Sequence, residues 1–177
     1  MNDPTIDYDQ INALARQAFA HWGQARLAEA AAGYAAAITL VRESGLPAGA
    51  DLHAQRAGVL DAWGQLDEAV AESELALGAE QARGGASDAA PAVKIARHFL
   101  ADRLVRQGQA ERALEVLAPS LAVLSDDWLL HMTQAEALSA AGRTDDARRA
   151  AEHAVAQAGS EAKRAQIAER LAAVLRR

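Results

Sequence analysis

Three glycines divide this chain into units that repeat one pattern of small and large side chains. They are Gly64, Gly108 and Gly142. An alanine stands seven residues before each glycine and a leucine four before it; an acid follows after three residues, an alanine after five and an aliphatic after thirteen. The columns are Ala57, Ala101 and Ala135; Leu60, Leu104 and Leu138; Asp67, Glu111 and Asp145; Ala69, Ala113 and Ala147; and Leu77, Leu121 and Val155. Five columns that agree across three units indicate an internal repeat.

The pattern within each unit is typical of two amphipathic helices joined by a short turn. The glycine accepts the positive φ with which many helices end. The acid falls in the first turn of the second helix, where its charge interacts favourably with the helix dipole. Alanines in fixed columns let the helices approach closely, and leucines fill the remaining space. One such pair cannot bury its apolar face alone, so the units are expected to stack.

A fainter unit precedes these three. Residues 22–24 (Trp-Gly-Gln) repeat residues 63–65, and Phe19 takes the leucine position four residues before Gly23. If the turn after Gly23 carries two extra residues, four residues of the next helix fall into register: Ala30, Tyr34, Ala37 and Ile38. We therefore predict about four units, at residues 5–44, 50–83, 89–124 and 126–158.

Composition extends the helical prediction to the whole chain. Alanine, the strongest helix former, accounts for 47 of the 177 residues. Aromatic residues make up 4%, and no run of strand-forming residues alternates with period two. We expect one all-α domain over residues 1–177, with loops at 44–47 and 83–87. The predicted helices are 5–23, 26–44, 50–63, 66–83, 89–107, 110–124, 126–141, 144–158 and 160–176.

Local signals predict where several helices begin and end. Ser125 and Ser160 each precede acidic residues and are predicted to be N-caps. Pro119 lies inside the sixth helix, which it should kink or shorten. The last helix, 160–176, has no partner in sequence but carries one apolar stripe, so we predict that it caps the final unit.

These columns resemble the tetratricopeptide repeat (TPR) over roughly residues 10–158. The shared features are the small residue, the large apolar residue, the turn glycine, and then alanine followed by alanine with an aliphatic residue. The resemblance implies a right-handed superhelical α-solenoid of about four helix-turn-helix repeats with a C-terminal capping helix. It also implies a protein that binds other proteins.

The chain departs from the TPR pattern in two columns and in its spacing. The turn glycines, counted from Gly23, lie 41, 44 and 34 residues apart, whereas the family repeats at about 34. We interpret this as a variant with longer units. The early tryptophan-like position holds His53, Arg97 and His131, and the aromatic position of the second helix holds Tyr34, Ser73, Leu117 and Ala151.

Charge and residue usage argue against several classes of protein. The formal charge is −6, and the arginines are dispersed among acids, whereas a nucleic-acid binder usually presents a basic face. The absence of cysteine excludes disulfides. The first residues lack the pattern of a signal peptide, and no apolar stretch approaches the ~20 residues that span a bilayer. We expect a cytoplasmic protein that binds neither nucleic acid nor membranes.

Candidate catalytic patterns have simpler explanations. The five histidines show no metal-binding spacing. Ser160 and Lys163 match a Ser-x-x-Lys pattern, but its companion motifs are missing and the serine opens a predicted helix. His98 and Asp102, four residues apart on one helix face, are interpreted as a solvated ion pair. No set of residues combines a nucleophile, a base and oxyanion donors, so we predict no enzyme, metal site or cofactor.

In TPR proteins the first helices of successive units line a concave groove. Carried over by register from each turn glycine, six residues of this chain are predicted to contact a partner there: Asp61, His98, Asp102, Arg106, Met132 and Glu136. Three of the six are acids, which favours a peptide of basic or mixed charge. TPR proteins that hold acidic chaperone tails use a clamp of asparagines and lysines, which this groove lacks, so we predict no clamp activity.

Three functions are compatible with this pattern. The leading one is an adaptor that holds a peptide or a helix in the groove. The second is a bacterial secretion-type TPR chaperone that holds a partly unfolded client protein. The third is a structural role in which the chain forms a homo-oligomer. Abundant arginine and alanine with only two lysines favour a GC-rich bacterial source.

Overall fold

The computed structural model describes residues 8–47, 49–83 and 87–176, and within these ranges all regular structure is helical. The predicted all-α fold of helix-turn-helix units is therefore confirmed. The predicted helix start at residue 5, the glycines of the 83–87 loop and the last arginine lie outside the described residues. The helices are α1 (Tyr8–Gly23), α2 (Leu27–Glu43), α3 (Ala50–Ala62), α4 (Leu66–Ala82), α5 (Pro91–Arg106), α6 (Ala110–Val123), α7 (Trp128–Ala140), α8 (Thr144–Ala156), α9 (Glu161–Arg170) and α10 (Ala172–Leu175).

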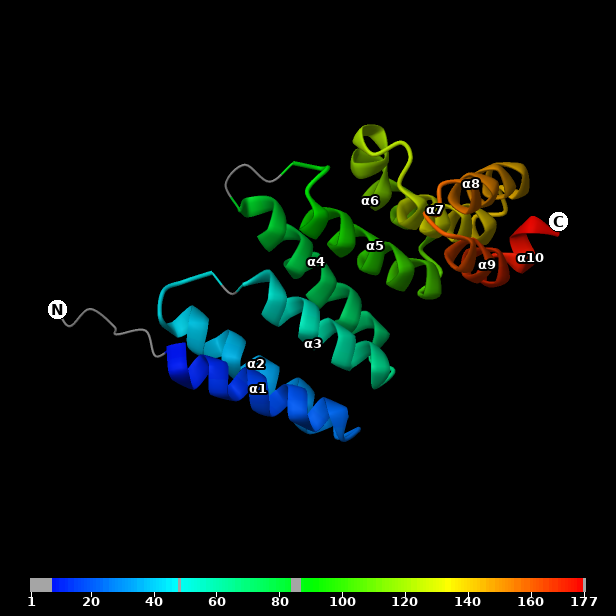
Figure 1. Ribbon diagram of the computed structural model, residues 1–177. Coiled ribbons are helices and arrows are strands. Elements are labelled where there is room, and N and C mark those ends of the chain that lie inside the picture. The colour runs from blue at the N-terminus through cyan, green and yellow to red at the C-terminus, as the bar shows by residue number, and fades with distance from the viewer. Residues whose placement is uncertain (1–7, 48, 84–86, 177) are drawn as a thin grey trace. The chain divides into compact units, whose positions relative to one another are not determined.

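The helices group into two compact units, which are described separately (Figure 1). In the first unit, α1 pairs with α2 and α3 with α4, and α2 packs on α3. In the second unit, α5 pairs with α6 and α7 with α8, while both α5 and α6 pack on α7. The short helices α9 and α10 cover α8. The assignment of the whole chain to a single domain stays a prediction.

The predicted turn glycines end the first helix of three pairs in the same way. Gly64, Gly108 and Gly142 have φ angles of 81°, 80° and 76°, in the left-handed region that favours glycine. The residue after each glycine donates its backbone N–H to the carbonyl of the repeated leucine, over 2.8, 2.8 and 2.9 Å. Each leucine of this column therefore contributes both a core side chain and the backbone carbonyl that accepts the hydrogen bond closing the turn.

In the turn between α1 and α2, the left-handed residue lies two residues later than the sequence repeat predicts. Ala25, not Gly23, has the left-handed backbone, with φ 57°, and Arg26 donates to the carbonyl of His21 over 2.9 Å. The extra residues therefore lengthen α1 instead of the turn. The prediction for Phe19 is wrong: its side chain is 62% exposed, and His21 stands in the leucine position. The predicted register of α2 is confirmed by four buried residues: Ala30, Tyr34, Ala37 and Ile38.

Small residues set the distance between helices in the first unit. A methyl group at Gly33 of α2 would lie 2.9 Å from the Cβ of Ala18 in α1, too close for ordinary packing. A methyl group at Gly58 of α3 would lie 2.8 Å from the Trp22 ring. Trp22 of α1 thus packs against α3, whereas Trp63 is 44% exposed.

Polar contacts take the place of the family's early tryptophan. In the first unit, His53 of α3 hydrogen-bonds Glu72 of α4 through Nδ1 and Oε2, 2.7 Å apart, and Arg56 pairs with the same carboxylate. Burial raises the pKa of Glu72, but the His53 hydrogen bond and the Arg56 charge outweigh it and leave that pKa lowered. In the second unit, Arg97 donates to the Val116 carbonyl over 2.6 Å and links α5 to α6.

Three predicted helix boundaries differ in detail. The N-cap of α7 is Asp127, whose carboxylate accepts from two backbone N–H groups at 3.1 Å, so the prediction for Ser125 is wrong. Ser160 caps α9 as predicted, accepting from the Lys163 N–H at 3.2 Å. Helix α6 continues through Pro119 to Val123, and the predicted last helix is interrupted at Leu171, which separates α9 from α10.

The left-handed alanine provides a test of the corrected turn. Ala25→Gly should raise the free energy of unfolding of the first unit by up to about 1 kcal/mol, because left-handed backbone at a residue with a Cβ costs about 1–2 kcal/mol. The reverse change at the equivalent turn, Gly64→Ala, should lower it by a similar amount. Both are measured by denaturant unfolding. An Ala25→Gly protein less stable than the wild type would contradict this account.

Candidate functional site

The six residues predicted to contact a partner fall into different surroundings. Asp61 lies half-buried in α3 of the first unit, and the other five belong to the second. His98 of α5 and Met132 of α7 are buried, with exposed fractions of 9% and 5%, and so offer little surface to a partner. Asp102 and Glu136 remain partly exposed, and the structure brings them together.

Asp102 and Glu136 share one guanidinium group. Arg170, at the end of α9, donates from Nε to Glu136 Oε1 over 2.6 Å and from Nη2 to Glu136 Oε2 over 3.0 Å. The same Nη2 also lies 3.0 Å from Asp102 Oδ1. Arg106 lies 3.6 Å from the other oxygen of Asp102. The hydrogen bond from Arg170 to Glu136 is the main reason that the pKa of Arg170 is raised, so its positive charge is held firmly.

Exposed apolar side chains continue the same face of α5. Ile95 and Phe99 are 40% and 50% exposed. Positions 95, 99, 102 and 106 recur at helical spacing, so these apolar residues share one stripe with Asp102 and Arg106. We call the surface formed by Ile95, Phe99, Asp102 and Glu136 the acid-pair face. It offers both charge and apolar contact to a partner.

His98 joins the two helices beneath this face. Its Nδ1 lies 2.7 Å from the hydroxyl oxygen of Thr133, which in turn donates to the Leu129 carbonyl over 3.1 Å. Because the hydroxyl proton is used in that second bond, Nδ1–H is the donor to Thr133. Burial is the main cause of a lowered pKa at His98. The interpretation of His98 as one half of a solvated ion pair is therefore wrong.

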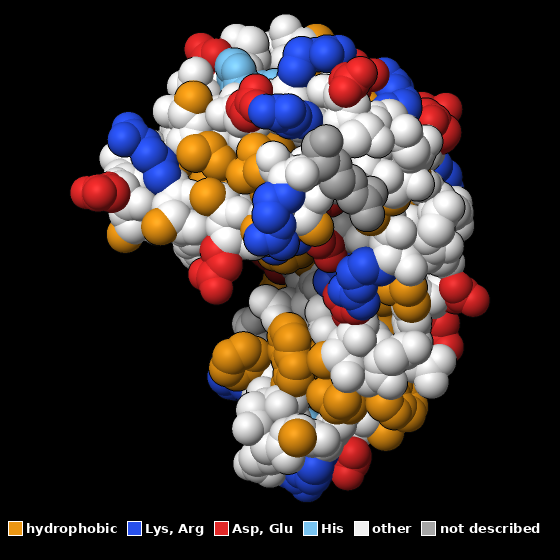
Figure 2. Space-filling model, turned by 90° about the vertical axis from the view of Figure 1, so that its right-hand side faces the viewer, with side chains coloured by type: hydrophobic (Ala, Val, Ile, Leu, Met, Phe, Trp, Pro, Cys, Tyr) orange, Lys and Arg blue, Asp and Glu red, His pale blue; other side chains and the backbone are white. Residues whose placement is uncertain are grey.

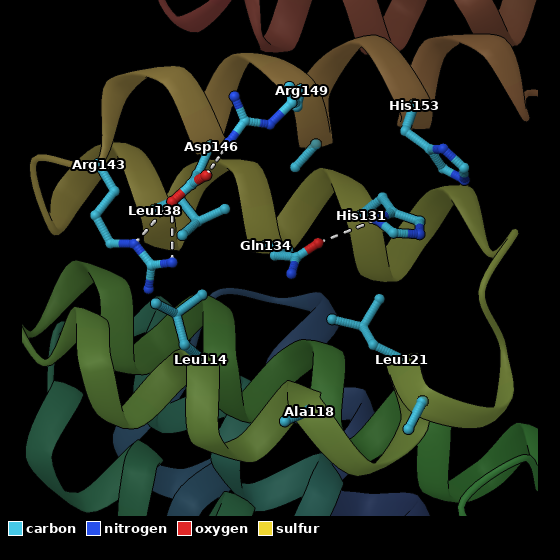
Figure 3. Close-up of a pocket in the computed structure, with 12 residues that line it drawn as sticks. Leu114, Ala118, Leu121, His131, Gln134, Leu138, Arg143, Asp146, Arg149 and His153 are labelled. Carbon is cyan, nitrogen blue, oxygen red and sulfur yellow. Dashed lines mark hydrogen bonds and ion pairs between the residues drawn. The ribbon is translucent and has the colours of Figure 1, made fainter.

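A second feature of this unit is an open groove of about 660 Å³ lined by α6, α7 and α8 (Figure 3). Helices α6 and α8 both pack on α7 and form the sides of the groove. Its centre is apolar, and its two ends are polar. The central residues are Leu114, Ala118, Leu121 and Ala122 of α6, Leu138 of α7 and Ala150 of α8.

Each end of the groove has its own polar cluster. At one end, Arg143 donates to Asp146 Oδ2 from Nε and Nη2, over 3.1 and 2.9 Å, and Arg149 pairs with Oδ1 of the same carboxylate. At the other end, the rings of His131 and His153 lie 4.2 Å apart, centre to centre. Both rings hydrogen-bond through Nε2 to a single backbone carbonyl, that of residue 125, over 2.6 and 3.1 Å.

Neither the role of Arg170 nor this groove could be predicted from the repeat pattern. Arg170 lies beyond the last repeat, so no column relates it to Asp102 or Glu136. Arg143 and Asp146 are spaced as a helical ion pair, a pattern that indicates a solvated helix surface as readily as a site. A groove depends on where side chains leave space, and periodicity reports only which residues share a face.

Within the described residues, every helix is too short or too polar to cross a lipid bilayer. The described residues also contain no group of three or more side chains that could together bind a metal ion. On the face drawn in Figure 2, basic and acidic side chains are interspersed, and hydrophobic side chains gather in several patches.

Solved structures resemble this chain far more closely in fold than in sequence. The nearly identical TPR-like repeats of a kinesin light chain from Podosopora anserina match with a TM-score of 0.76 at 18% identity, over 86% of this chain and 77% of that one. BtubC (BKLC) from P. vanneervenii matches with a TM-score of 0.75 at 19% identity, over 96% and 75%. MamA from Desulfovibrio magneticus RS-1 matches with a TM-score of 0.69 at 14% identity, over 95% and 94%.

The fold is of the tetratricopeptide type. The TPR interpretation of the glycine-anchored columns is thereby confirmed at the level of fold. No protein-family model and no curated protein matches the sequence. In this TPR-type fold α5 and α7 are the first helices of successive units, so the acid-pair face corresponds to the surface on which partner contacts were predicted.

The buried histidine predicts how the second unit responds to pH. Because the folded pKa of His98 lies below its ordinary value of 6.5, the unfolded chain binds a proton first as pH falls. His98 therefore contributes full stability above that value, and the contribution is lost as pH decreases from there towards the folded pKa. His98→Gln keeps a donor for Thr133 but removes the titration, so its stability should fall less between neutral and mildly acidic pH.

Trp128 fluorescence in a Trp22→Phe, Trp63→Phe background follows unfolding of the second unit, which contains no other tryptophan. The two proteins differ only at residue 98, so the difference between the two stability profiles isolates His98. Identical profiles would contradict a lowered pKa at this residue.

Proposed function

We propose that this protein is a non-catalytic interaction module that holds an arginine-bearing segment of another protein on its acid-pair face. The observation that supports this most directly is the position of Arg170. Its guanidinium group donates hydrogen bonds to both oxygens of Glu136 and to one oxygen of Asp102, which is the forked recognition that arginine favours. The two acids thus have the spacing that an arginine side chain requires.

An incoming arginine can exchange with Arg170 because the cluster is open to solvent. The side chains of Asp102, Glu136 and Arg170 are 25%, 22% and 44% exposed. Ion pairs with this much solvent contact stabilise a protein by about 0–1 kcal/mol. Additional contacts with Ile95 and Phe99 would favour the partner over the internal arginine, since buried apolar area adds about 25 cal/mol per Å². The preferred ligand therefore combines arginine with apolar residues.

A fluorescent peptide with arginine and leucine side chains tests the chemistry of the site. Asp102→Asn combined with Glu136→Gln should weaken its binding about tenfold or more, because the charged acceptors are lost. Arg170→Gln should strengthen it about two- to fivefold, because the internal competitor is removed. Replacing the peptide arginines by lysine should weaken binding to the wild type, since lysine cannot form the fork. Affinities are measured by fluorescence anisotropy.

The matched control is Arg148→Gln, which removes an exposed ion pair with Glu152 in α8 without touching the acid-pair face. It should leave the affinity unchanged. If Arg170→Gln weakens binding or leaves it unaltered, the cluster is a tether for α9 and the proposal fails. A native pull-down from source lysate compares the wild type with Asp102→Arg plus Glu136→Arg. A partner retained by both proteins would also place the site elsewhere.

A further inference from the structure

The groove between α6 and α8 is as long as a short helix. Its lining runs from Asp146 to His153 along α8 and from Leu114 to Ala122 along α6, a rise of seven and eight residues respectively. At 1.5 Å per residue this is roughly 10 Å, or about two helical turns. Its volume of about 660 Å³ also lies within the range of about 300–1,000 Å³ typical of ligand sites.

The apolar centre would contact the side chains of such a helix. Leu114 and Leu121 are half-buried at the side of the groove, and Leu138 of α7 forms its floor. Ala118 is exposed and projects only a methyl group, so space remains above it. Apolar residues of a ligand helix at positions i, i+4 and i+7 recur on one face and can fill this space, as in other helix-in-groove complexes.

The charge of the groove selects the sign of the ligand. Its charged lining consists of Arg143, Arg149 and Asp146, a balance of +1 in a chain whose formal charge is −6. The hydrogen bond from Arg143 is the main reason that the pKa of Asp146 is lowered, so this carboxylate stays ionised between the two arginines. The other N–H groups of Arg143 and Arg149 have no partner in the described part of the chain.

The neighbouring charged residues lie outside the lining of the groove. Asp145 borders an adjoining depression next to the same arginines, but it does not line the groove. Arg148 is paired with Glu152 on another side of α8. At the opposite end, His131 and His153 direct their Nε2 atoms to the backbone carbonyl of residue 125, and the exposed carboxylate of Asp126 lies 3.6 Å from His153 Nε2, so the charge beside this end is negative. The groove therefore favours a ligand with a negative charge at the arginine end.

We propose that this groove binds an amphipathic helix of another protein. The bound stretch is about two turns long, with aliphatic side chains at i, i+4 and i+7 and a glutamate or aspartate at the end that faces Arg143 and Arg149. This surface is separate from the acid-pair face, and the proposal does not depend on the function proposed for that face. The ligand chemistry is also the opposite: acidic here and basic there.

The experiment uses acetylated and amidated helical peptides of about four turns, which carry no terminal charge. One has leucines in the i, i+4, i+7 pattern with glutamates at one end; a second has lysines in place of the glutamates; a third has serines in place of the leucines. Binding to the full chain is measured by fluorescence anisotropy. The glutamate–leucine peptide should bind at least about tenfold more tightly than either of the others.

Two pairs of variants locate the binding. Arg149→Glu should weaken binding of the glutamate–leucine peptide about tenfold or more. Arg148→Glu, one residue earlier on α8, should change the affinity less than about twofold. Ala118→Arg should block the groove, and Val123→Arg, at an exposed position of α6 outside it, should not. Asp102→Asn plus Glu136→Gln should leave this binding unaltered, which separates it from the acid-pair face.

Several results would overturn the inference. One is failure of the glutamate–leucine peptide to bind the wild type. Another is an equal loss of affinity for this peptide in Arg149→Glu and in Arg148→Glu. A third is tighter binding of the lysine peptide. Equilibrium sedimentation covers the remaining occupant: a dimer that dissociates in Ala118→Arg but not in Val123→Arg would mean that a second copy of the chain fills the groove.

Discussion

The first helix of each pair carries a buried alanine seven residues before the left-handed residue of its turn. Ala18, Ala57, Ala101 and Ala135 are all completely buried. A single methyl group at this place lets two helix backbones approach closely, as Ala18 does against Gly33, and in the three later pairs a buried leucine follows three residues on. The turn residue must then adopt a left-handed backbone to bring the second helix back along the first. Helix spacing, turn conformation and leucine packing thus depend on one small side chain.

This dependence explains which parts of the fold could be predicted. From α3 to α8 the helix boundaries agree with the predicted ones to within two residues, because glycine, leucine and acid signals coincide at each turn. In the first pair the predicted bounds of the turn also agree to within one residue, but the left-handed position was assigned to Gly23, because the tryptophan–glycine pair at residues 22–23 repeats residues 63–64. The structure instead keeps Ala18 at the buried position and accepts a left-handed backbone at Ala25. Burial of the alanine column has outweighed a local backbone preference.

The sites were less predictable because they depend on contacts distant in sequence. Asp102 and Glu136 stand in the same column, six residues before their turn glycines, so the repeat predicted that they share a face. Arg170 follows Glu136 by a further 34 residues but belongs to a helix outside the repeat. Burial of His98 was also missed, since a histidine on a helix face carries no sign of whether a neighbour covers it. The groove arises from small side chains, and a sequence pattern does not record empty space.

Helix α7 contributes residues to both surfaces of the second unit, because α5, α6 and α8 all pack on it. Glu136 meets Arg170 on the acid-pair face, while Gln134 and Leu138 line the groove with α6 and α8. Between them, Thr133 holds His98 and is completely buried. Alternate residues of one helix therefore serve surfaces of opposite charge, while the core between them is closed. A TPR-type unit can in this way vary either surface without repacking the other, because the contacts that define the fold lie in the alanine and leucine columns.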